Sequence, residues 1–112
     1  MINITFKPQS LELEITGHAG ADEKGKDIVC SAVSMLFYTL AESLNRSEEM
    51  LKKHPIIKME DGNGYIKCRP RKEFQGNIAL IYWTVLNGIG LLAEEYSEYI
   101  TFRVIGGEKD GK

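Results

Sequence analysis

Hydrophobic and polar positions divide the chain into five short segments with a period of two and two long segments with helical spacing. Apolar residues alternate with polar ones in residues 2–7, 11–15 and 100–105, which is typical of strands with one buried face. Residues 56–60 and 65–69 flank the sequence Asp-Gly-Asn-Gly, a strong reverse-turn signal. These two segments therefore predict a β-hairpin.

The two long segments, residues 28–44 and 73–96, carry apolar side chains on more than one face, as helices buried on several sides do. A short helix is expected over residues 47–53, with Ser47 as its N-cap, before Pro55 ends it. The order β-β-α-β-β-α-β predicts an α+β domain of two layers. In it a mixed or antiparallel sheet carries both long helices on one face.

A chain of 112 residues with 43% hydrophobic and 27% charged residues has the composition of one globular domain. We expect that domain over residues 1–106, and a polar, disordered tail over residues 107–112. The two long helices are more apolar than one sheet face requires, so a homodimer is expected to cover the remainder. The first residues do not read as a signal peptide, and we expect a cytoplasmic protein without a membrane partner.

The formal net charge of −2 gives the chain no broad attraction to nucleic acid, so we expect no direct nucleic-acid partner. A local basic patch remains compatible with that net charge. Arg69, Arg71 and Lys72 form a small basic cluster beside Pro70. The cluster is either a solvated turn or a surface that steers an acidic group of a partner.

The residues that could carry out a reaction lie between the second strand and the first long helix. The strand runs into His18, and a polar loop with Gly20 and Gly25 leads to Asp27, a residue type preferred at helix N-caps. With Asp27 as the cap, Cys30 is the third helical residue, where the helix dipole stabilises a thiolate. The sequence thus supplies a nucleophile, a base and a loop that can bring them together.

Each of these residues also has a purely structural interpretation. A cysteine in an apolar helix is commonly a small buried hydrophobe. The loop over residues 19–26 is either a soluble connection or a lid that closes over a substrate. Cys68 and His54 are interpreted as a structural residue and a surface residue. No metal-ligand spacing is evident, so we expect neither a metal nor a cofactor.

The stretch from Gly17 to Ser34 resembles the family of ribosomal-processing cysteine proteases, Prp. The matching positions are Gly17-His18-Ala19, Gly25, Asp27-Ile28-Val29-Cys30 and Ser34. The resemblance extends over essentially the whole chain. It implies a bacterial endopeptidase that removes the N-terminal extension of a large-subunit ribosomal protein, the bL27-type protein. By position, Cys30 corresponds to the nucleophile and His18 to the base.

Asp27 and Ser34 match further positions of the family motif, and Gly17, Gly20 and Gly25 belong to its loop. Asp27 is placed both to cap the helix and to contact His18. Backbone N–H groups at the start of the helix are candidates for binding the oxyanion. Two other functions remain open. One is a non-catalytic ribosome assembly factor that binds the same peptide tail, and the other is a redox or metal protein that uses His18, Cys30, His54 and Cys68.

Overall fold

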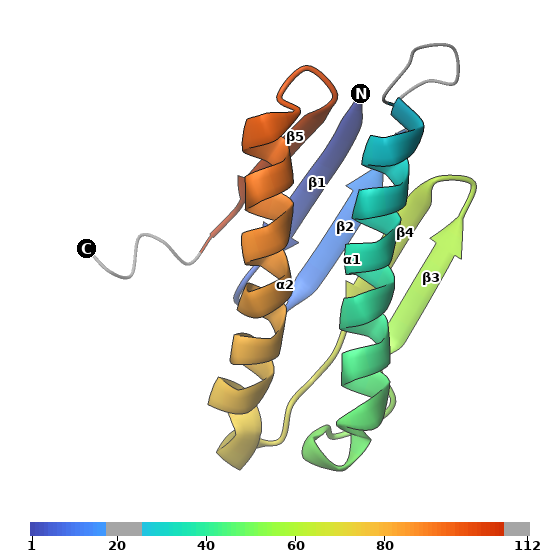
Figure 1. Cartoon of the computed structure of the whole chain (residues 1–112). Coiled ribbons are helices and arrows are strands. Elements are labelled where there is room, and N and C mark those ends of the chain that lie inside the picture. The colour runs from blue at the N-terminus through green and yellow to red at the C-terminus, as the bar shows by residue number, and fades with distance from the viewer. Residues whose placement is uncertain (18–25, 107–112) are drawn as a thin grey trace.

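Five strands form a single sheet, and two long helices cover one of its faces (Figure 1). The computed structural model describes residues 1–17 and 26–106, without the side chains of Lys26 and Asp27. The sheet order is β3-β4-β2-β1-β5. The strands are β1 (Ile2–Lys7), β2 (Glu12–Thr16), β3 (Ile56–Glu60), β4 (Asn63–Lys67) and β5 (Ile100–Val104).

The sheet is mixed, because β5 runs parallel to β1 while every other neighbouring pair is antiparallel. Ile4 of β1 lies between Ile15 of β2 and Phe102 of the edge strand β5. Alternation along β1 and β2 buries the apolar side chains under the helices and exposes the polar ones. The predicted α+β fold with both helices on one face is confirmed.

The helices are α1 (Lys26–Arg46) and α2 (Gln75–Glu95), with short 3₁₀ turns η1 (Glu48–Met50) and η2 (Lys72–Phe74) before β3 and α2. By length and apolar composition alone both long helices could cross a membrane, a property shared by core helices of globular proteins. Here they pack side by side on the sheet. Gly88 allows close packing, because a Cβ atom there would lie 3.1 Å from the Leu36 side chain.

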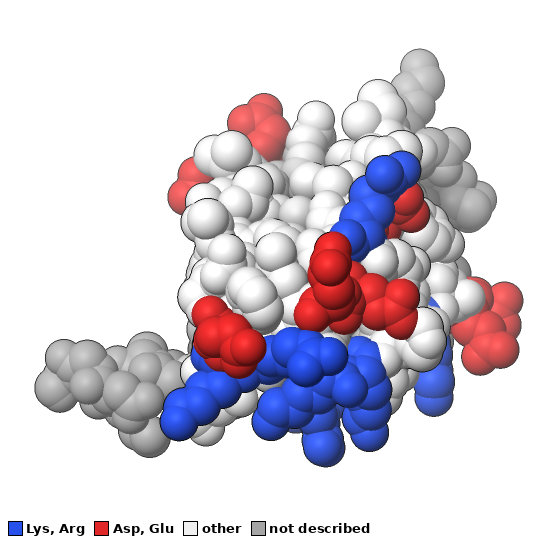
Figure 2. Space-filling model, turned by 90° about the horizontal axis from the view of Figure 1, so that it is seen from below, with Lys and Arg blue, Asp and Glu red and all other residues white. Residues whose placement is uncertain are grey.

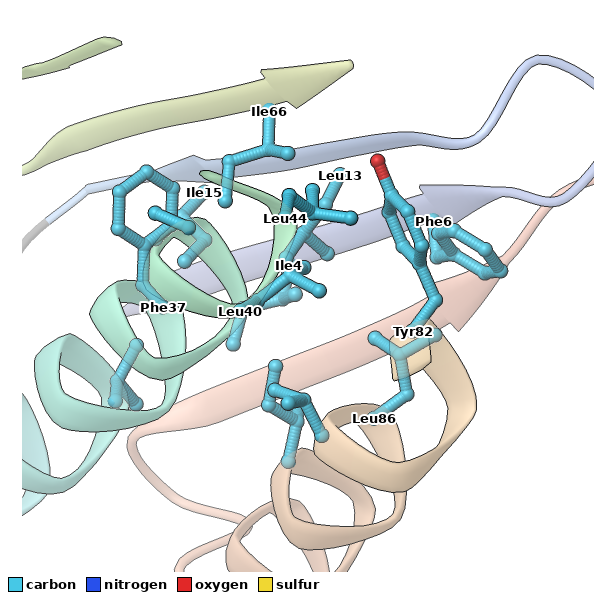
Figure 3. Packing of buried hydrophobic residues seen from close by; sticks show 14 of the residues in the cluster. Ile4, Phe6, Leu13, Ile15, Phe37, Leu40, Leu44, Ile66, Tyr82 and Leu86 are labelled. Carbon is cyan, nitrogen blue, oxygen red and sulfur yellow. The ribbon is translucent and has the colours of Figure 1, made fainter. Parts of the chain in front are cut away.

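The core lies between the sheet and the helices (Figure 3). Phe6 of β1 stacks on Tyr82 of α2 with 5.5 Å between ring centroids, while Phe37 and Leu40 of α1 cover the other half of the sheet. Each fully buried aliphatic or aromatic side chain contributes roughly 1.5–3 kcal/mol through burial. This packing fixes the ends of β2 and α1, where the candidate chemistry lies.

Three local features differ from the sequence predictions. Leu11 belongs to the β1–β2 turn with a positive φ of 54°, and the strand begins only at Glu12. The predicted helix over residues 47–53 is reduced to η1, and the Ser47 side chain does not cap it. The β3–β4 turn is tighter than expected: Asp61 and Gly62, both with positive φ, connect the strands, so β4 begins at Asn63.

Candidate active site

A pocket of about 210 Å³ lies where β2 ends and α1 begins. Three of the residues predicted to belong to the site line it: Gly17, Cys30 and Ser34. Because Gly17 ends the β2 segment while Cys30 and Ser34 lie on α1, the pocket joins the two ends of the candidate motif. Its wall opposite α1 includes Met59 and Gly62 of the β3–β4 hairpin.

Cys30 is a free thiol, half-buried, and it packs against the hydrophobic core. Ser34 follows one helical turn later and is also half-buried, so the two side chains share one face of α1. The thiol therefore has one side anchored in the core and one side open to the pocket. This arrangement suits a nucleophile that must hold its position and still reach a substrate.

Gly17 fixes the backbone at the end of β2. Its φ is +92°, and a Cβ atom there would lie 2.3 Å from the Met1 carbonyl oxygen, so no other residue fits without strain. Its backbone N–H donates to Asn63 Oδ1 at 3.3 Å. These contacts hold the chain at the residue that directly precedes His18.

His18, Gly20 and Gly25 lie outside the described residues, as does most of the 19–26 loop. For Asp27 only the backbone is described. Helix α1 begins at Lys26, so Asp27 belongs to the first turn instead of capping it, and Cys30 is the fifth helical residue instead of the third. The reason is that Lys26 already adopts helical geometry, which moves the start of the helix ahead of the aspartate. A carboxylate in the first turn still interacts favourably with the helix dipole.

Six pocket residues were not predicted from the sequence: Ile2, Ile15, Val33, Tyr38, Met59 and Gly62. Tyr38 is 49% exposed and lies two turns beyond Cys30, and Met59 comes from the β3–β4 hairpin. The helical spacing of Cys30, Ser34 and Tyr38 is visible in the sequence and would have indicated the tyrosine. Met59 carried no such signal, because its place depends on β4 pairing with β2.

The second cysteine has a different environment. Cys68 is buried, and the Tyr82 hydroxyl lies 3.5 Å from its Sγ atom. Burial raises the pKa of the Cys68 thiol, so it stays protonated and unreactive. The imidazole of His54 is exposed and contacts the Glu48 carboxylate. Both residues thus have the structural and surface roles predicted for them, and the described part of the chain contains no group of side chains suited to a metal ion.

Comparison with known proteins relates the chain to a family with a known type of reaction. Residues 1–101 match the family model described as "Cysteine protease Prp". The ribosomal processing cysteine protease Prp of Staphylococcus aureus is 27% identical over 99 residues, which cover 88% of this chain and 91% of that protein.

Solved structures agree with this match. The S. aureus protease in complex with a covalently linked product peptide has a TM-score of 0.70 and 25% identity, covering 94% of this chain and all of that one. Its complex with a substrate peptide has a TM-score of 0.66 and 26% identity, covering 93% and 97% of the two chains. The family model spans nearly the whole chain, and the fold is shared. The chain therefore belongs to the cysteine protease Prp family and is a cysteine-type peptidase.

Proposed function

We propose that Cys30 is the nucleophile and His18 the general base of this peptidase. We further propose that its substrate is the N-terminal extension of the large-subunit ribosomal protein of the bL27 type. The observation that carries the proposal is the pocket that joins Cys30 and Ser34 to Gly17, the residue directly before His18. The relatives support a ribosomal peptide as the substrate, because they are ribosomal processing proteases and one of them was solved with a substrate peptide.

The proposed reaction passes through an acyl-enzyme. His18 takes the thiol proton, and the Cys30 sulfur attacks the scissile carbonyl carbon to form a tetrahedral oxyanion. Collapse of that intermediate breaks the C–N bond, and His18 returns the proton to the leaving amine. Water, deprotonated by His18, then attacks the thioester, releases the carboxylate product and restores the thiol.

The start of α1 and four further residues have supporting roles in this proposal. The first N–H groups of α1 have no acceptor within the helix and are candidates to bind the oxyanion. Asp27 contacts and orients His18, and Ser34 lines the pocket one turn from the nucleophile. Gly20 and Gly25 give the connecting loop the freedom to close over the peptide. No metal or cofactor takes part.

We also propose that the protein works in the cytoplasm as a homodimer. The support for the homodimer comes from the helical layer. Four of its apolar side chains are each more than 60% exposed: Ile28, Met35, Leu80 and Leu91. An apolar surface of this kind is costly to leave in water. Sedimentation of the purified protein tests the dimer, and a monomer at all concentrations would remove this part of the proposal.

Cleavage of a synthetic peptide that spans the extension and the first mature residues tests the reaction. Mass spectrometry should show a single cut with the unaltered protein, and Cys30→Ala and His18→Ala should each reduce the rate by at least about 1,000-fold. Cys68→Ala and His54→Ala are the matched controls, because they change the same residue types outside the pocket. Binding without cleavage would instead favour a non-catalytic assembly factor, and loss of cleavage in all four variants would contradict the assignment of the pair.

A further inference from the structure

A second hollow, of about 510 Å³, lies at the other end of the molecule from Cys30. The β1–β2 turn, the end of β4 and the start of α2 meet there (Figure 1). Three cationic side chains line it, those of Lys52, Lys67 and Arg69, and none of its lining residues carries a carboxylate. It is larger than the Cys30 pocket, and the peptidase reaction assigns it no role.

A smaller hollow of about 70 Å³ continues the same surface. It shares Lys67 and Arg69 with the larger hollow and adds Lys53 and His54. No carboxylate lines it, although the Glu48 carboxylate contacts the His54 imidazole. Lys52, Lys53, Lys67 and Arg69 thus form a continuous basic track across two depressions. The view of this end of the molecule shows Lys and Arg side chains gathered along one side (Figure 2).

The charges of this track are only partly compensated. Among the described residues, Lys52, Lys53 and Arg69 form no ion pair. Lys67 is the exception, because it lies near the charged Glu12 carboxylate and helps to lower the pKa of that group. The chain as a whole has a net charge of −2. The track is therefore a local concentration of positive charge that the net charge conceals.

We propose that this basic track binds the phosphate backbone of single-stranded RNA. Lys67 and Arg69 are two residues apart, about 7 Å along an extended chain, and cations that repeat over two joined depressions match a chain of regularly spaced phosphates. A compact anion would need only one depression. RNA binding at this track differs from the expectation of no nucleic-acid partner, which rests on the net charge and stays untested. The track lies outside the Cys30 pocket and is independent of the peptidase mechanism.

The lining also predicts how the RNA is recognised. Neither hollow is lined by an aromatic side chain on which a base could stack; the apolar lining includes Pro8, Leu11 and Pro70. Binding therefore depends on phosphate contacts, with little preference for sequence and a strong dependence on salt. Contacts with three or four phosphates give a slope of about −2 to −3 in a plot of log K against log salt concentration.

Fluorescence anisotropy with a labelled, mixed-sequence RNA oligonucleotide in about 50 mM salt tests the proposal. The test variant is Lys52→Glu with Arg69→Glu. The matched control is Lys58→Glu with Arg103→Glu, two exposed cations outside both hollows that give the same net charge. The test variant should bind at least about 10-fold more weakly with a salt slope reduced by about 1, and the control should stay close to the unaltered protein.

Several outcomes would overturn the proposal. Equal weakening in both variants would show that only overall charge matters, and no RNA binding by the unaltered protein would remove the site. Competition by polyglutamate as strong as that by unlabelled RNA would indicate a surface for acidic peptides. Full displacement of the RNA by pyrophosphate at the same phosphate concentration would indicate a small-anion site. Peptide cleavage, measured in parallel, should be unchanged in both variants and shows that they are folded.

Discussion

Gly17 shows how one residue without a side chain shapes the candidate site. Its positive φ turns the chain away from β2, and its Cα lies so close to the Met1 carbonyl that a methyl group has no room. The same backbone is tied to the β3–β4 hairpin through Asn63. The approach to His18 is therefore set by backbone contacts that only glycine permits.

Replacement of Gly17 by alanine should destabilise the fold. The forbidden backbone region and the contact with Met1 together cost about 2 kcal/mol or more, which lowers Tm by roughly 8 °C or more. Gly90→Ala is the control: a Cβ atom there meets nothing within 4 Å, and inside α2 alanine is the better helix former by about 0.5–1 kcal/mol. Thermal unfolding by circular dichroism should move the two variants in opposite directions. A shift in the same direction would contradict the steric account.

At the scale of elements, the position of α2 depends on a single hydroxyl group as well as on its apolar face. The Tyr82 hydroxyl donates to the Leu11 carbonyl at 2.9 Å, in the strained turn between β1 and β2. The Tyr82 ring stacks on Phe6. One side chain thus joins α2 to both the sheet and the turn beneath it.

Tyr82→Phe should keep the stacking and lose the hydrogen bond. The Leu11 carbonyl then lacks its donor, and we expect a loss of about 1–2 kcal/mol in the free energy of unfolding, measured by urea denaturation with an unchanged slope. Tyr38→Phe is the matched control, because its ring is 49% exposed and water replaces any partner of its hydroxyl. Equal losses in the two variants would show that the buried bond has no special role.

The element order and both long helices were predictable from the sequence. Apolar residues alternate with polar ones in β1 and recur at helical spacing in α2, and these are the side chains that the fold buries. The pairing of β4 with β2 was not predictable, since residues 46 positions apart, such as Gly17 and Asn63, leave no local signal. The same limit applies to the site. Cys30 and Ser34 were identified from the motif, whereas Met59 enters the pocket only through that strand pairing.

At the scale of the whole molecule, the charge distribution is more informative than the net charge. The outer face of the sheet is polar and carries a hydrogen-bonded group of Ser10, Glu12 and Tyr65. The Ser10 hydrogen bond, followed by that of Tyr65, lowers the pKa of the Glu12 carboxyl from 4.5, and the Glu12 carboxylate raises the pKa of Tyr65 to about 12. The free energy of unfolding therefore depends on pH in the acid range through Glu12 and in the alkaline range through Tyr65.

The sign of this linkage at acid pH is fixed by Glu12. Because its pKa is lower in the folded protein, its contribution to stability is present above pH 4.5 and is lost as the pH falls through the folded value. Ser10→Ala should therefore reduce stability near neutral pH, within about 1 kcal/mol for a group that is only half-buried, and should flatten the acid branch of the stability curve. Ser97→Ala, on an exposed residue after α2, is the control. Parallel curves for Ser10→Ala and the unaltered protein would contradict the linkage.

The most direct test of the central assignment uses the two cysteines of this chain as target and internal control. The protein is incubated with a chloromethyl ketone of the substrate peptide, and its tryptic fragments are mapped by mass spectrometry. We expect one adduct, on Cys30, that unmodified substrate peptide prevents, with Cys68 unmodified in its buried site. An adduct on Cys68, or labelling of Cys30 that the substrate peptide does not prevent, would contradict the assignment of Cys30 as the nucleophile of a peptide-binding site.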